Sequence, residues 1–528
     1  MLTWRFAFGL GAILALVSVF LFSHGSSQAA ATIHVDSANA CPGAGTLVNP
    51  YCTIQLGVNA AAASDTVSVR PGTYVDPVDI DSRTNISIVG DNKNTVIMKP
   101  TSTLCWNVST YGCSRKAAIR IVNSTGINVS NITLDMDTVK ANFAHGFLVW
   151  DSTGSVGNNI LKNNSVSDAS GGYYEIMMYV RAPGYSDASR ANVVVAGNTF
   201  LEAGRVGVVT HGYVAATIQA NTFTKTLNDF GYAVEMGSES TGTIASNTIS
   251  GYDTAALSDG SSSAGIYVEN SFTGASPAVT KNVSIVGNEI FGNQFGMWIG
   301  NGYDGFAGPI DVVVSLQGNN VHDNTDAGIL IEDEDASAGS SVTVNSASDT
   351  VQNNGSVGYW LGTYGDGELH VTITNGTIGG QDYGILVQDW ASGPSTSVYD
   401  VSANFNSIVG NVTFGISNEV SALLDGECNW WGANSGPSGA GAGTGDASST
   451  NVDFDPWLAS EGASCGGGGP LSVGGIVGLM DESGARAPEA PAQGDATGSL
   501  GGGTMAGLAV LGTLVSVAAW LIKRRASA

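Results

Sequence analysis

The stretch from Val283 to Asp304 decides the fold, and it reads V-S-I-V-G-N-E-I-F-G-N-Q-F-G-M-W-I-G-N-G-Y-D. It holds two short runs in which apolar residues alternate with others, and Gly and Asn close each run. Alternation with a period of two is typical of a β-strand, and both runs are too short for a helix. The stretch therefore predicts one coil built from short strands and tight corners.

Versions of this coil recur along most of the chain. The first run carries an Asn-x-apolar signature that starts at Asn198, Asn221, Asn247, Asn288, Asn319 and Asn406. The second run starts at Gly207, Gly265, Gly296, Gly328, Gly358 and Gly384. Repeats whose corners accept insertions are typical of a solenoid. The sequence therefore predicts an all-β fold, a right-handed parallel β-helix of about a dozen coils stacked about 4.8 Å apart.

Further motifs mark both ends of the repeats. Tyr51-Cys52-Thr53-Ile54-Gln55 and Val69-Arg70-Pro71-Gly72-Thr73-Tyr74 open the series, and Asn429-Trp430-Trp431-Gly432 and Asp455-Pro456-Trp457-Leu458 close it. With the Gly-Asn coils between them, residues 32–458 resemble the pectin-lyase-like β-helix superfamily, in particular its carbohydrate-binding and sugar-hydrolase repeat group. That superfamily contains lyases, hydrolases, esterases, epimerases and non-catalytic surface proteins. The resemblance therefore implies the fold and leaves the reaction open.

The segments outside the repeats predict export and a membrane anchor. Residues 1–31 have a basic start, an apolar middle and small residues at the end, which is typical of a cleaved signal peptide; an uncleaved anchor is the alternative. Residues 32–458 form the β-helix, and residues 459–504 form a flexible stalk rich in Gly, Ala and Pro. Residues 505–522 form a transmembrane helix, and the basic residues 523–528 stay in the cytoplasm.

Composition agrees with an extracellular solenoid. The chain has 528 residues with 72 glycines, and only 12% of its residues are charged. Its formal net charge is −26, so nucleic acid is excluded as a partner, because phosphate binding needs a basic face. The six cysteines fall into pairs that are local in sequence, and export favours disulfides: Cys41 with Cys52, Cys105 with Cys113, and Cys428 with Cys465.

Both ends of a solenoid need a cover. Thr53 can cap a short helix that places Ile54, Val58 and Ala61 on one face, over the first coil. Trp430, Trp431 and Trp457 are expected to close the last coil.

Aligning the second runs on their Gly predicts an apolar strip on the outside of the helix. Tyr267, Trp298 and Trp360 belong to this strip, and Trp390 follows just after its strand. Aromatic rings stack on the C–H faces of sugars, so these four residues are candidate glycan-binding residues. The alternative is that long turns fold back and cover the strip.

A second outward column is acidic. The alignment places Glu235 and Glu269 on adjacent coils of this column, where the pair could serve as the acid and nucleophile of a glycosidase. Glu332, Asp333 and Asp335 extend the row and could ligate Ca²⁺, the only cofactor that the sequence suggests. A solvated acidic ladder is the alternative for both sets.

Three functions remain open. The first is a cell-surface, membrane-tethered β-helix that binds polysaccharide or acts as an adhesin-like module. The second is a polysaccharide lyase or glycoside hydrolase, although the catalytic signatures of the superfamily mostly do not match; Asp76-Pro77-Val78-Asp79, for example, lacks the His of the epimerase motif. The third is a structural spacer of the envelope without a ligand.

Overall fold

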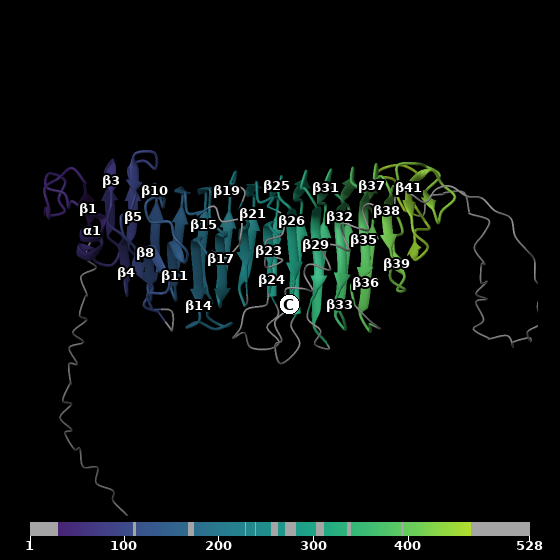
Figure 1. Cartoon of the computed structure of the whole chain (residues 1–528), viewed down its shortest axis with the longest axis horizontal. Helices are drawn as coiled ribbons and strands as arrows, with labels where there is room; N and C mark the ends of the chain where they lie inside the picture. Colours follow the sequence, from purple (N-terminus) through teal and green to yellow (C-terminus); the bar gives the residue numbers. More distant parts are fainter. Residues whose placement is uncertain are drawn as a thin grey trace, which may run out of the picture.

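The chain coils into one long stack of strands, with α1 (Ile54–Ala60) at one end and β39 (Leu424–Asp425) and β41 (Gly445–Ser448) at the other (Figure 1). This computed structural model describes residues 30–108, 112–166, 174–227, 229–237, 239–254, 262–269, 281–301, 311–334, 339–391 and 395–465. In this part of the chain the only α-helix is α1 (Ile54–Ala60), and three long sheets run along the stack. The predicted all-β parallel solenoid is therefore confirmed.

Most coils contribute one strand to each of the three sheets. Within the described residues, sheet A has 15 parallel strands: β1 (Thr32–Val35), β2 (Thr66–Val69), β5 (Ser87–Gly90), β9 (Ile127–Ser130), β12 (Gly154–Gly157), β15 (Ala191–Ala196), β18 (Val214–Gln219), β21 (Thr241–Ala245), β24 (Lys281–Val286), β27 (Asp311–Gln317), β30 (Ser341–Ala347), β33 (Glu368–Thr374), β36 (Val398–Asn404), β39 (Leu424–Asp425) and β42 (Val452–Asp453).

Sheet B has the fewest strands of the three sheets. Its 12 strands in the described part are β3 (Gly72–Tyr74), β6 (Val96–Met98), β10 (Thr133–Asp135), β13 (Ile160–Lys162), β16 (Thr199–Leu201), β19 (Thr222–Thr224), β22 (Thr248–Ser250), β25 (Glu289–Phe291), β28 (Asn320–His322), β31 (Thr350–Gln352), β34 (Thr377–Gly379) and β37 (Ser407–Ile408).

Sheet C carries the face on which the candidate site lies. In spatial order its strands are β4 (Val78–Asp81), β8 (Lys116–Val122), β11 (Ala144–Trp150), β14 (Ile176–Ala182), β17 (Val206–Gly212), β20 (Tyr232–Met236), β23 (Ala264–Val268), β26 (Phe295–Gly300), β29 (Ala327–Asp333), β32 (Val357–Thr363), β35 (Tyr383–Asp389), β38 (Phe414–Asn418), β41 (Gly445–Ser448) and β40 (Pro437–Gly439). A short strand, β7 (Leu104–Cys105), pairs antiparallel with β8.

The core is a column of aliphatic side chains inside the three sheets. In β24 the inward residues Val283 and Ile285 are buried, whereas Asn282 between the strand's inward positions is exposed. The same alternation in β27 and β30 confirms the period-two prediction.

Asparagines hold the corner between sheets A and B. The Asn198 amide nitrogen donates to the Val156 carbonyl at 2.8 Å and to the Asn221 amide oxygen at 3.0 Å. That oxygen also accepts the backbone N–H of Asn198 at 2.9 Å, and the pattern repeats at Asn247, Asn288 and Asn319. These side chains pair backbone groups that the corner leaves unpaired, so the repeated Asn is structural.

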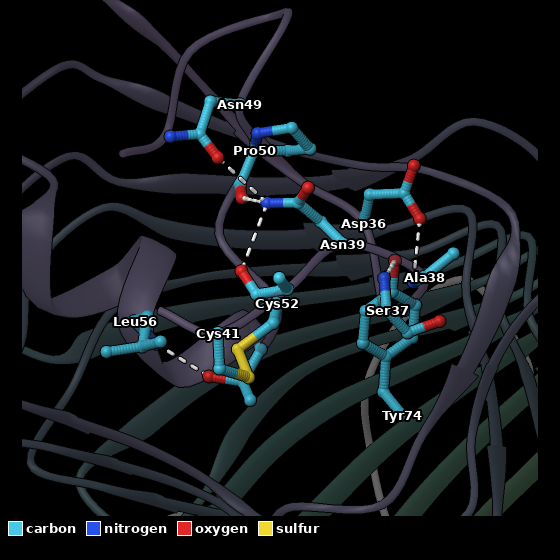
Figure 2. The surroundings of a disulfide bond; sticks show 12 residues. Asp36, Ser37, Ala38, Asn39, Cys41, Asn49, Pro50, Cys52, Leu56 and Tyr74 are labelled. Atoms are coloured by element: carbon cyan, nitrogen blue, oxygen red, sulfur yellow. Dashed lines mark hydrogen bonds between the residues drawn. A yellow bond between two sulfur atoms is a disulfide. The ribbon is translucent and has the colours of Figure 1, made fainter. Parts of the chain in front are cut away.

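Each end of the stack has a cover, although only Trp431 of the three predicted tryptophans is buried and Trp457 is half-buried against the core. The Thr53 hydroxyl caps α1 by accepting the Leu56 N–H at 3.2 Å, and Ile54 and Val58 are buried. Figure 2 shows the Cys41–Cys52 disulfide beside this helix. At the other end, the Trp431 indole is buried in the main core.

The three predicted disulfides are all present. Their Cα–Cα distances are 5.2, 4.4 and 5.3 Å for Cys41–Cys52, Cys105–Cys113 and Cys428–Cys465. No helix among the described residues is long and apolar enough to cross a membrane. The predicted transmembrane helix at 505–522, the basic tail, residues 466–504 of the stalk and residues 1–29 of the signal peptide lie outside the described residues.

Candidate functional site

The outer face of sheet C carries two columns of side chains that run along the rod. Strand pairing aligns Tyr179, Val209, Glu235, Tyr267 and Trp298 in the first column. Arg181 and His211 are neighbours in the second column, which reaches Gly300 and Glu332 farther along.

The structure corrects the alignment of Glu235. The sequence places it in the second column, directly beside Glu269, whereas it pairs with Val209 and Tyr267 in the first column. The sequence alignment uses Gly231 as the equivalent of Gly207. In the structure Val206 pairs with Tyr232, so the residue opposite Gly207 is Ala233. Position 207 itself requires glycine, because a Cβ on Gly207 would lie 2.5 Å from the Ala233 carbonyl oxygen.

Glu235 and Glu269 nevertheless converge, and His211 joins them. One carboxylate oxygen of each glutamate and one ring nitrogen of His211 all lie within 4.8 Å of one another. The three side chains are nearly buried; those of His211 and Glu235 are 5% and 10% exposed. Gly237 makes room for this arrangement, since a Cβ there would lie 2.1 Å from the His211 ring.

A chain of polar contacts passes through His211. The Tyr179 hydroxyl lies 3.2 Å from Nδ1 of His211, and Nε2 lies 3.1 Å from the Glu235 carboxylate. Burial lowers the pKa of His211 and outweighs the opposing hydrogen bond to Glu235, so the imidazole is neutral near pH 7. A neutral imidazole has one donor and one acceptor nitrogen, and a proton can therefore move between Tyr179 and Glu235 through it.

Lys281 approaches the same carboxylates from the corner between sheets C and A. It begins β24, is 1% exposed, and donates from its ammonium group to the Met236 carbonyl at 2.9 Å. Burial lowers its pKa, whereas the charges of Glu269, Glu235 and Glu239 act in the opposite direction. Sequence reasoning missed Lys281 and Tyr179. A signal for the first existed, because Lys281 is the only Lys or Arg between residues 226 and 465.

The aromatic strip is largely covered. Trp298 and Trp360 are each 3% exposed and Trp390 is 4% exposed, within a second apolar cluster on the outside of sheet C. Trp360 donates from its indole to the Gln388 amide oxygen at 3.0 Å. Tyr267 alone among the four predicted glycan-binding residues is half-buried, with its ring 4.7 Å from that of Trp298. The expectation of an exposed platform therefore gives way to the covered alternative at the three tryptophans.

Two of the predicted calcium ligands have other partners. The Asp333 carboxylate accepts from the Asn301 amide at 2.6 Å and from the Glu368 N–H at 2.9 Å. Glu332 accepts from the Trp298 indole, and Asp335 lies outside the described residues. Of the residues that the structure describes, only His211, Glu235 and Glu269 form a group of at least three metal-ligand side chains. A histidine nitrogen and the nearby Lys281 suit Ca²⁺ poorly, because Ca²⁺ prefers oxygen ligands.

Comparisons with known proteins describe the fold. A family model for the right handed beta helix region matches residues 185–378, and no curated protein matches the chain. The catalytic unit of the thermostable GH87 alpha-1,3-glucanase from Streptomyces thermodiastaticus is 18% identical, with 74% of this chain and 70% of that chain covered and a TM-score of 0.47. The A-module of the mannuronan C-5 epimerase AlgE4 from Azotobacter vinelandii is 16% identical, with 74% and 93% covered and a TM-score of 0.40. At this identity the likeness concerns the solenoid alone.

Proposed function

We propose that this protein is an exported β-helix enzyme that cleaves glycosidic bonds in a polysaccharide, with Glu235 and Glu269 as its catalytic pair. The observation that carries the proposal is the convergence of both carboxylates and His211 within 4.8 Å. A pair of carboxyl groups about 5 Å apart is the arrangement of retaining glycosidases. Two carboxyl groups in such an arrangement can act as the acid and the nucleophile.

The roles follow from the neighbours of each carboxyl group. Glu235 contacts His211 and can exchange a proton with it, so Glu235 donates that proton to the glycosidic oxygen as the C–O bond breaks. Glu269 attacks the anomeric carbon and forms a glycosyl ester. Water then hydrolyses the ester, and Glu235 takes the proton of that water.

The surroundings suit a polymer that lies along the rod. Tyr267 is half-buried and pairs with Glu235 across the strands, so its ring can stack on a sugar next to the carboxyl group. Arg181 is half-buried on the other side of His211. Side chains suited to binding sugars on both sides of the acidic pair favour cleavage at internal glycosidic bonds of the polysaccharide.

We also propose that the protein is exported and anchored in a membrane by its C-terminal segment. The apolar residues 505–522 are followed at once by Lys523, Arg524 and Arg525, which supports a membrane anchor with the β-helix outside the cell. Three disulfides in the described part agree with an oxidising compartment. Membrane fractionation of the full chain and of a variant that ends at residue 504 tests the anchor; an unchanged membrane fraction would contradict it.

The second candidate is a binding protein without catalysis, as the half-exposed ring of Tyr267 allows. One experiment separates the two functions. The full chain in detergent is mixed with size-marked polysaccharides of several classes, and the products are run on a sizing column. Shorter polysaccharide fragments that form with wild type but not with Glu235→Gln or Glu269→Gln support the enzyme. Polysaccharide that elutes at larger size with wild type and with both variants supports binding.

Glu289→Gln is the matched control. Glu289 lies on the outer face of sheet B, far from the pair in the coil, and its carboxylate contacts Asn320 and His322 instead. This variant should cleave as wild type does. Cleavage that survives in both active-site variants would remove Glu235 and Glu269 from the mechanism.

A further inference from the structure

Three consecutive coils of sheet C each supply one metal-ligating side chain to the candidate site. His211 lies on β17, Glu235 lies on β20, and Glu269 directly follows β23; these strands pair one after another. One ligand atom of each residue lies within 4.8 Å of the other two, and all three residues are buried. Because paired strands hold the three backbones in place, the ligand set is assembled before an ion arrives.

The distances in this set suit a tetrahedral ion. Zn²⁺ binds imidazole nitrogen and carboxylate oxygen at about 2.0 to 2.2 Å, which places two of its ligand atoms about 3.3 Å apart. Nε2 of His211 and the carboxylate oxygen of Glu235 lie 3.1 Å apart. The Glu269 oxygen lies within 4.8 Å of the other two ligand atoms, so a side-chain shift of about 1.5 Å or less completes the geometry.

The other ring nitrogen of His211 has the partner that a ligand histidine needs. Nδ1 lies 3.2 Å from the Tyr179 hydroxyl. When Nε2 binds a metal, the proton of the neutral imidazole sits on Nδ1, and the hydroxyl oxygen can accept it. Such a partner fixes the orientation of the ring and strengthens the ligand. Tyr179 is itself held in place, because it is 2% exposed and its ring lies 4.9 Å from that of Trp106.

The chemistry of the ligands favours zinc over calcium. Lys281 acts electrostatically on Glu269 and Glu235 and opposes any cation, so an ion held by charge alone is disfavoured. An imidazole nitrogen, in contrast, binds Zn²⁺ well, whereas Ca²⁺ prefers oxygen ligands. His211 therefore decides the class of ion. Three protein ligands leave the fourth tetrahedral position for water or a sugar hydroxyl.

We propose that His211, Glu235 and Glu269 form a site for a divalent transition ion of the Zn²⁺ class, and that the bound ion inhibits cleavage. The ion takes the oxygen lone pairs with which Glu269 attacks and with which Glu235 accepts a proton. The inhibition rests on the function proposed above, whereas the binding of the ion does not.

Binding can be measured with Zn²⁺ alone, by equilibrium dialysis of the full chain in detergent. Wild type should bind one ion at least about 100-fold more tightly than His211→Gln does, because a ligand is lost. His322→Gln is the matched control, since it removes a histidine that contacts Glu289 at 2.7 Å on sheet B, and it should bind as wild type does. Equal affinity in wild type and His211→Gln, or an equal loss in both variants, would mean an adventitious ion only and would overturn the proposal.

Tyr179→Phe covers the case in which His211→Gln does not fold. This change removes only the hydroxyl group and keeps the ring that packs against Trp106. It should weaken Zn²⁺ binding by about 10- to 100-fold. Nitrogen-15 labelled histidine gives a second signal, because Zn²⁺ should shift the ring nitrogens of one histidine in wild type. Wild-type affinity in Tyr179→Phe, or a wild-type histidine spectrum that Zn²⁺ leaves unchanged, would overturn the site.

Activity then separates the two proposals. Where wild type cleaves a polysaccharide, the Zn²⁺ concentration for half inhibition should equal the dissociation constant from dialysis, and Tyr179→Phe should need about 10- to 100-fold more Zn²⁺. Cleavage that continues at saturating Zn²⁺ would overturn the inhibition. If wild type cleaves no polysaccharide, the proposed function fails, and dialysis still decides whether the metal site exists.

Discussion

At the scale of single residues, the corner asparagines carry much of the order of the stack. Asn221 donates to the Val195 carbonyl at 2.8 Å and to the Asn247 amide oxygen at 3.0 Å. Its own oxygen accepts from the backbone and side chain of Asn198. All of these groups are buried, so their partners cannot be replaced by water.

Asn221→Ala should therefore lower the free energy of unfolding by about 2 to 5 kcal/mol, since it leaves at least two buried backbone groups without a partner. Urea denaturation followed by circular dichroism measures the change. Asn282→Ala is the control, because Asn282 is exposed on the outer face of β24 and should cost less than about 0.5 kcal/mol. Similar losses in both variants would show that the buried hydrogen bonds are not the cause.

His322 predicts a pH dependence of stability. Burial lowers its pKa, but hydrogen bonds to Asp323 and Glu289, both at 2.7 Å, raise it by more, so the pKa in the folded state lies above the usual value. Its stabilising effect is then fully present below about pH 6.5 and is lost as the pH rises through the folded-state pKa.

The comparison of wild type with His322→Gln measures this effect. The difference in urea midpoint between them should be largest at low pH and should shrink as the pH rises. A difference that stays constant from acid to alkaline pH would mean that the charge of His322 contributes nothing.

At the scale of elements, glycines in the second column leave space on the outer face of sheet C for large neighbouring side chains. Gly237 follows the end of β20 and leaves the space that the His211 ring fills. Gly362 does the same for Trp390, since a Cβ there would lie 2.6 Å from the indole. Glycines in this column thus decide which large side chains can lie flat on the sheet.

Gly237→Ala should displace His211 and break its contact with Glu235, while the strands remain paired. We expect a loss of catalytic activity of at least about tenfold with the circular dichroism spectrum unchanged, because misplacing one catalytic group typically costs that much or more. Gly157→Ala, in sheet A, is the control and should keep full activity; its Cβ would come no closer than 3.3 Å to another atom. Full activity in Gly237→Ala would exclude a role for the position of His211.

At the scale of the whole molecule, stability depends on closed ends, because each coil contacts only its neighbours. The last coils contribute only short strands such as β39 and β42. The Cys428–Cys465 disulfide closes a loop that spans 37 positions, begins shortly after β39 and contains β42. Unfolding is expected to start at an end where this closure is lost.

Replacing both Cys428 and Cys465 with Ser should destabilise this end by about 2 to 4 kcal/mol. Hydrogen exchange is the suitable measurement: amides of β39 and β42 should exchange faster, while those of β24 and β27 in the middle of the stack should not change. Faster exchange along the entire rod would instead mean that the solenoid unfolds as one unit.

The sequence by itself determined the features that depend on local periodicity. Alternation along β24, the capping helix at Thr53 and the disulfide pairs Cys41–Cys52 and Cys105–Cys113 follow from residues close together in the chain. Such features need no knowledge of neighbouring coils, because strand faces and caps repeat with a fixed spacing.

Only the tertiary structure decided the site. The register between coils depends on corner geometry. Glu235 therefore lies in the first column, because Ala233 and not Gly231 stands opposite Gly207. Burial of Trp298 and Trp360 depends on what lies over sheet C, and the position of Lys281 depends on its contact with the Met236 carbonyl of another coil. These contacts join residues tens of positions apart, and a one-dimensional pattern does not contain the distances between them.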